Sequence, residues 1–84
     1  MNIQTKNEYF KSSDFYLCCF LYAKGGCVLD IDNTNPRRSL FVFEKTPELI
    51  GDVDDFNFNR GLINPKAYAV AIKELKSRLY SQGH

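Results

Sequence analysis

Two acidic residues in an alternating segment are the first candidates for chemistry. Asp30 and Asp32 belong to the run Cys27–Asp32, whose alternation predicts a β-strand with Leu29 and Ile31 on the opposite face. Side chains two positions apart on a strand share a face, so the two carboxylates are expected about 7 Å apart, which suits a divalent cation. A solvated strand face explains the same pattern, and we favour that interpretation over a metal-dependent enzyme.

A second group of carboxylates lies further along the chain. Asp52, Asp54 and Asp55 follow Gly51. Metal sites and acid–base pairs draw their carboxylates from several elements around one pocket. A charged helix end explains these three residues equally well, so we expect them to be solvated.

The three cysteines do not have the spacing of a zinc site or the company of a catalytic thiol. Cys18 and Cys19 are neighbours and Cys27 stands alone, whereas structural zinc takes four ligands, commonly in closely spaced pairs. A nucleophilic thiol needs a base such as His, and the single His of the chain is His84. We therefore expect the cysteines to pack in the core, and we expect no metal, no cofactor and no catalytic residue.

Arg37 and Arg38 form the most distinctive basic pair. They stand in the segment 33–38, whose Asn and Pro residues are typical of a turn. Two guanidinium groups on a protruding turn can bind phosphates, and Lys24 is expected nearby. The formal net charge of the whole chain is only +1, which excludes dominant electrostatic capture of nucleic acid. Nucleic-acid binding through Arg37, Arg38 and Lys24 is therefore the alternative function.

The elements that must position these residues follow from hydrophobic periodicity and helix capping. Ser13, Thr46 and Asn64 are the expected N-caps of three helices. The predicted order is helix, strand, strand, short helix, an optional third strand and helix, at 14–24, 27–32, 39–44, 47–56, 61–64 and 65–80. This order predicts an α+β fold in which a small antiparallel sheet packs with an N-terminal and a C-terminal helix. We expect 9–80 to form a single α+β domain, and 1–8 and 81–84 to fray.

Two of these elements are apolar on more faces than a small domain easily covers. The helix at 14–24 is apolar in nearly every direction, so it is either central or reserves one face for a partner. The strand at 39–44 has phenylalanines on one face and Leu40 and Val42 on the other. We therefore expect both faces of this strand to be covered.

The balance of surface favours an interaction module. A chain of 84 residues buries only about 60–65% of its unfolded surface, and this one carries seven Phe and five Tyr. Some apolar surface is therefore expected to stay exposed and to mark a partner surface, chiefly Tyr16, Phe56, Phe58 and Tyr80. We expect a non-catalytic interaction module that forms a homo-oligomer or binds another protein. A metal-dependent enzyme using Asp30 and Asp32 is the remote alternative.

Composition limits the class of protein further. Hydrophobic residues make up 44% of the chain and aromatic residues 14%, which excludes a disordered chain. The longest stretch without a charged residue, 15–23, is far shorter than the ~20 residues of a membrane-spanning helix. The opening segment 1–11 is polar and lacks the pattern of a signal peptide. We therefore expect a cytoplasmic protein whose thiols are reduced.

An ordered set of short motifs covers most of the chain from Tyr9 to Tyr80. The motifs are Phe10-x-Ser12-x-Asp14-Phe15-x-Leu17, Gly25, Leu29-Asp30-Ile31, Arg38, Phe41-Val42-Phe43-Glu44, Asn64-Pro65 and Leu75-Lys76-Ser77-x-Leu79-Tyr80. Together they resemble a family of small bacterial and bacteriophage domains of unknown function. The chain departs from that pattern at Cys18-Cys19, where a small residue such as Ala is expected. The resemblance implies an uncharacterised small protein, often from phage or mobile elements, and it offers no catalytic residues to transfer.

Overall fold

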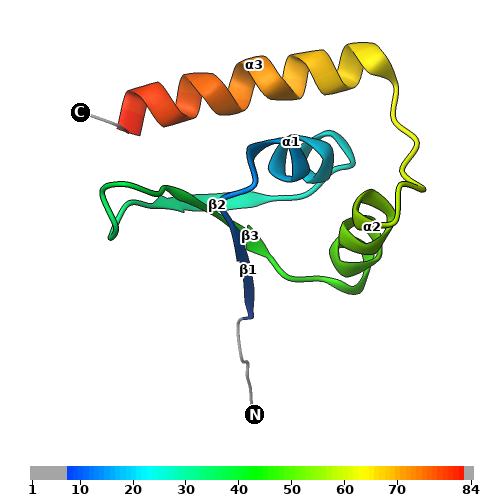
Figure 1. The fold of residues 1–84 in the computed structure, drawn as a ribbon, viewed down its shortest axis with the longest axis horizontal. Coiled ribbons are helices and arrows are strands. Elements are labelled where there is room, and N and C mark those ends of the chain that lie inside the picture. Colours follow the sequence, from blue (N-terminus) through cyan, green and yellow to red (C-terminus); the bar gives the residue numbers. More distant parts are fainter. Residues whose placement is uncertain (1–7, 83–84) are drawn as a thin grey trace.

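The structure, a computed structural model, describes residues 8–82. Within this range the chain forms three helices and a three-stranded antiparallel sheet (Figure 1). The elements are β1 (Tyr9–Ser12), α1 (Phe15–Ala23), β2 (Val28–Asp32), β3 (Leu40–Glu44), α2 (Pro47–Asn57) and α3 (Pro65–Gln82). The predicted α+β class is confirmed, and the observed order is β-α-β-β-α-α. Fraying was predicted for 1–8 and 81–84; of these, 1–7 and 83–84 lie outside the described residues, whereas 81–82 continue α3, so the prediction is wrong there.

The third strand lies before the first helix and not at 61–64. β1 pairs antiparallel with β3, with Phe10 opposite Phe43, and this gives the sheet order β1-β3-β2. Residues 61–64 have no regular structure. A Cβ at Gly61 would stand only 2.6 Å from the Phe20 ring, so this segment packs closely against α1 instead of joining the sheet. The prediction missed β1 because a four-residue strand is defined by its partner rather than by its own pattern.

The helix ends follow local capping chemistry. Asp14, and not the predicted Ser13, caps α1, and its carboxylate accepts a hydrogen bond from the Leu17 N–H at 3.2 Å. The Thr46 hydroxyl accepts from the Leu49 N–H at 3.0 Å and confirms the predicted start of α2. The predicted Asn64 cap is also confirmed, because its side-chain oxygen accepts from the N–H groups of the first turn of α3.

α1 is the central element of the fold. It lies between the sheet and α3, and α2 packs against it from the side (Figure 1). The residues from Leu17 to Leu21 are all buried. An all-round apolar helix is stable in water only in such a central position, which explains the lack of an apolar stripe in its sequence. Cys18 and Cys19 are fully buried in this helix, as the core-packing interpretation predicted. The same prediction is wrong for Cys27, which is exposed just before β2.

The sheet presents one face to the helices. Phe10, Ile31, Phe41 and Phe43 lie on that inner face and belong to or contact the core. On the outer face Val42 is also buried, but its neighbours there are strand side chains such as Lys11 and not a second layer of helices. Both faces of β3 are therefore covered at their centre, as predicted. Helices pack on the inner face, and side chains of the neighbouring strands cover Val42 on the outer face.

β2 is not a regular alternating strand. Its register with β3 shifts between Val28 and Asp30, which leaves Leu29 as the extra residue of a β-bulge. Leu29 is 48% exposed, so the prediction that it shares the buried face of Ile31 is wrong.

None of the helices in residues 8–82 is long and apolar enough to cross a membrane.

Candidate functional site

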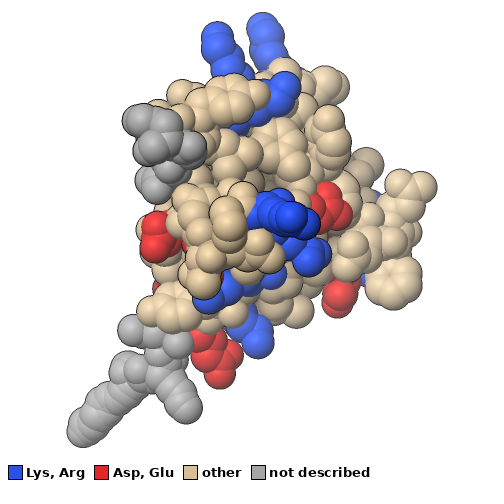
Figure 2. Space-filling view, turned by 60° about the vertical axis from the view of Figure 1, so that its left-hand side comes forward, with Lys and Arg blue, Asp and Glu red and all other residues tan. Residues whose placement is uncertain are grey.

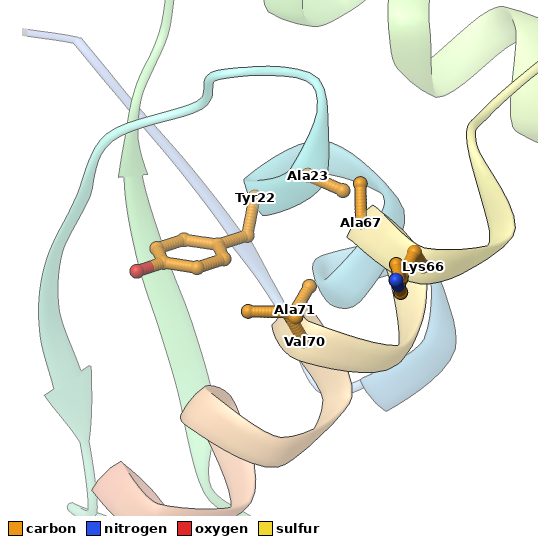
Figure 3. Close-up of a pocket in the computed structure, with 6 residues that line it drawn as sticks. All are labelled: Tyr22, Ala23, Lys66, Ala67, Val70 and Ala71. Carbon is orange, nitrogen blue, oxygen red and sulfur yellow. The ribbon is translucent and has the colours of Figure 1, made fainter.

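An apolar groove opens between the C-terminal end of α1 and the first half of α3. Its volume is about 390 Å³, and it is lined by Tyr22, Ala23, Lys66, Ala67, Val70 and Ala71. Figure 3 shows the Tyr22 ring at one end of the groove and Lys66 at the other, with small aliphatic side chains between them. Only one of the six lining residues is charged, so the groove suits an apolar side chain flanked by a negative charge.

The groove exists because α3 meets α1 through small residues. Ala71 faces the core and is fully buried, and Ala67 lies one helical turn before it. Alanine side chains are too short to fill the space beside Tyr22, whereas Val70 stands further round the helix and is 51% exposed. The helix pair is therefore close-packed at its core and open at its edge.

Hydrogen bonding holds the Tyr22 ring against α3. The Tyr22 hydroxyl donates to the Glu74 carboxylate at 2.6 Å. The Arg78 guanidinium lies 5.7 Å from the centroid of the Tyr22 ring. The hydrogen bond to Glu74 raises the pKa of Tyr22, so this phenol stays neutral and serves as a wall of the groove.

The predicted partner residues do not form one surface. Tyr16, Phe58 and Tyr80 are largely exposed, whereas the Phe56 ring packs 5.5 Å from that of Phe20 and is half-buried. The Tyr16 carbonyl accepts a hydrogen bond from the Tyr68 hydroxyl at 3.2 Å. Tyr80 lies twelve residues beyond Tyr68 on α3, which is about 18 Å at 1.5 Å per residue. Tyr80 therefore lies far along α3 from the point where this helix contacts Tyr16.

The prediction missed four exposed aromatic or aliphatic residues, Tyr9 and Leu29 on the sheet and two others near α3. Leu62 is 83% exposed in the loop before α3, and Val70 is half-exposed on α3. Val70 falls outside the arc of the last helix that holds the other large aliphatic residues. An aliphatic residue on the otherwise polar face of an amphipathic helix is the signal that could have found it.

The structure separates Lys24 from the arginine turn. The Arg38 Nε donates to the Ser13 hydroxyl at 3.2 Å, just before α1 begins. The Lys24 ammonium instead donates to the Leu62 carbonyl at 3.4 Å, just after α1 ends. The nine residues of α1 put about 13 Å between these two points. Lys24 therefore does not belong to the same basic patch as Arg37 and Arg38.

The turn that carries the arginines is exposed and locally ordered. The Asn35 side chain accepts from the Arg37 N–H at 3.0 Å, and the Ser39 hydroxyl donates to the Asn33 side chain at 2.6 Å. Figure 2 shows Lys and Arg side chains in the middle of the face that contains this end of the molecule, and others along its top, where α3 lies. Arg37 and Arg38 are thus exposed and available for contact.

Asp30 and Asp32 lie on the outer face of the sheet, and both carboxylates have local partners. Asp30 accepts a hydrogen bond from the Ile31 N–H at 2.8 Å. Asp32 accepts from the Thr34 N–H at 2.9 Å and pairs with the Lys11 ammonium at 3.3 Å. Hydrogen bonds from Thr34, followed by Lys11, lower the pKa of Asp32 to about 2. Across the described part of the chain, no group of three or more His, Cys, Asp or Glu is placed to hold a metal ion.

The second acidic group lies on α2. Asp52, Asp54 and Asp55 all belong to this helix, and Glu48 adds a fourth carboxylate in its first turn. Asp55 pairs with the Arg60 guanidinium at 3.4 Å. The helix therefore presents a negative surface, whereas α3 presents three exposed lysines.

The fold and the groove together define a small α+β domain with an open apolar surface. A family model described as Domain of unknown function (DUF5659) matches residues 7–81. The chain belongs to this family, which confirms the resemblance to a family of unknown function drawn from its ordered motifs. Comparisons with curated proteins and with solved structures found no match.

Proposed function

We propose that this domain is a non-catalytic protein-interaction module that self-associates through the groove between α1 and α3. The observation that carries the proposal is the groove itself, an open apolar hollow with one cation, Lys66, at its end. Its lining offers apolar contact area and a single charge, which is what a binding surface requires. The bacterial or phage origin implied by the resemblance is part of the same proposal.

Exposed apolar surface near the groove supports this function. Val70 lines it, and Leu62 is exposed beside Lys24 in the loop that leads into α3. Each square ångström of apolar surface removed from water stabilises a complex by about 25 cal/mol before the costs of association. A second molecule seated here would therefore remove from water the apolar area that this small domain leaves uncovered.

A matched pair of variants tests the proposal. Val70→Gln replaces a half-exposed aliphatic residue of the groove with a polar residue of higher helix propensity. Leu29→Gln makes a similar change at a residue of nearly equal exposure on the sheet. Sedimentation equilibrium up to high micromolar concentration should show association of the parent and of Leu29→Gln, and weaker association of Val70→Gln. A monomeric parent, or equal association of all three proteins, would show the proposal to be wrong.

The exposed arginine turn supports nucleic-acid binding as a second candidate function. Arg37 and Arg38 are both exposed on a turn ordered by its own hydrogen bonds. Phosphate contacts from two arginines predict weak binding that falls steeply with salt. Fluorescence anisotropy with labelled DNA and RNA should then show a lower affinity for Arg37→Ala/Arg38→Ala than for the parent. Equal affinities would remove this candidate.

We also propose a cytoplasmic location. Cys18, Cys19 and Cys27 are all free thiols, which fits a reducing compartment. Two of them are buried in the core, where oxidation would disturb packing.

A further inference from the structure

α2 presents an acidic line with a gap at its centre. Leu49 on this helix is buried, and Glu48, Gly51 and Asp55 lie on the other side at spacings of three and four residues. A Cβ at Gly51 would meet no atom within 4 Å, so packing within this chain does not require the glycine. Glycine weakens a helix, but it lets another backbone or side chain come close.

α3 presents the complementary line. Lys66, Val70 and Lys73 are exposed on its solvent side at spacings of four and three residues. Lys66 and Val70 are also lining residues of the groove, so a helix laid on this line covers the groove's edge. Val70 thus projects between two cations, as Gly51 lies between two carboxylates.

We propose that α2 of one copy docks antiparallel on α3 of a second copy. This inference rests on the self-association proposed above and names the surface that covers the edge of the groove. In an antiparallel register Gly51 faces Val70, so that a side chain enters the gap left by the missing Cβ. The same register pairs Glu48 with Lys73 and Asp55 with Lys66, since the two ends of each line are seven positions apart, or about 10 Å.

Charge favours the contact of α2 with α3 over a contact between two copies of the same helix. Two α3 lines would set lysines against lysines, and two α2 lines would set carboxylates against carboxylates. Asp55 already pairs with Arg60 in its own chain, but an exposed ion pair of this kind is weak and leaves the carboxylate able to accept a second cation.

The contact is heterologous, because it joins two different surfaces. α2 lies at the side of the molecule and α3 along the top (Figure 1). In a pair, one copy therefore keeps a free α3 surface and the other keeps a free α2 surface. Repetition of the contact produces a ring or an open chain.

Charge reversal on each helix tests the proposal. One variant is Glu48→Lys/Asp55→Lys, whose two lines are both basic. The other is Lys66→Glu/Lys73→Glu, whose two lines are both acidic. Each variant alone should associate at least about tenfold more weakly than the parent, since like charges then face each other. An equimolar mixture should recover association, because every contact between the two variants again joins opposite charges.

A control and a second variant keep the test decisive. Asp30→Lys/Glu44→Lys makes the same change in net charge at exposed positions on the outer face of the sheet, away from both helix lines, and it should associate like the parent. Gly51→Leu should raise the stability of the folded chain, because leucine is a far better helix former, and should weaken association by filling the gap. Circular dichroism checks that each variant is folded.

The outcomes separate this inference from the proposed function. If the parent associates and Val70→Gln weakens it, but the charge-reversal variants associate like the parent or their mixture fails to recover, the pairing of α2 with α3 is wrong and the interaction module stands. A monomeric parent would overturn both.

Discussion

At the scale of single residues, burial decides what the three thiols can do. Burial raises the pKa of Cys18 to about 12 and that of Cys19 to about 11, so neither forms a thiolate near neutral pH. The Cys18 thiol also donates to the Ser12 carbonyl at 3.6 Å. Cys27, in contrast, is exposed just before β2.

Thiol accessibility is therefore the first prediction. In the folded protein at pH 8, a thiol reagent such as dithionitrobenzoate should react quickly with one cysteine, Cys27. In denaturant all three should react. The Cys27→Ser variant should show no fast reaction when folded, and rapid reaction of Cys18 or Cys19 in that variant would contradict their burial.

The Asp32 carboxylate predicts a second residue-scale effect. Its pKa of about 2 in the folded state is below the ordinary value of 3.8 because Thr34 and Lys11 stabilise the ionised form. A depressed pKa contributes stability above the ordinary value, and this contribution is lost as the pH falls toward 2. Stability from urea unfolding should therefore fall less between pH 4 and pH 2 in Asp32→Asn than in the parent. An NMR titration of Asp32 with a midpoint near its ordinary value would contradict the prediction.

At the scale of elements, capping determines where the central helix begins. Asp14 rather than Ser13 supplies the cap, because its carboxylate can reach the Leu17 N–H while the Ser13 hydroxyl accepts from Arg38. Both residues are good caps by type, and only the path of the chain out of β1 decides between them.

A pair of alanine variants tests this assignment. Asp14→Ala should lower the free energy of unfolding by about 1 kcal/mol, the usual cost of losing a helix cap. Ser13→Ala removes an exposed hydroxyl and should change it by less than about 0.5 kcal/mol. Urea denaturation measures both, and a larger effect at Ser13 would reverse the assignment.

At the scale of the whole molecule, the position of α1 explains the surface that is left open. α1 packs against the sheet, α2 and α3, and it therefore covers most of the apolar surface of these elements. Val70 and Leu62 remain exposed at the end of the domain where α1 finishes. A larger domain would cover them with another element, whereas here a second molecule is the proposed cover.

Local patterns determined much of this protein from sequence alone. Capping and periodicity act between residues close in the chain, and they predicted four features correctly. These are the starts of α2 and α3, the strands β2 and β3, the central or partner-facing nature of α1, and the burial of Cys18 and Cys19. Asp30 and Asp32 were also placed correctly on one strand face, because they precede the turn beyond the bulge.

Only the tertiary structure decided the features that depend on distant partners. β1 became a strand by pairing with β3, and Leu29 turned outward because of the bulge. Lys24 lies away from the arginine turn because α1 separates the two. The groove forms where Tyr22 meets the alanines of α3. These contacts join residues far apart in the chain, and side-chain periodicity carries no information about which distant surfaces will meet.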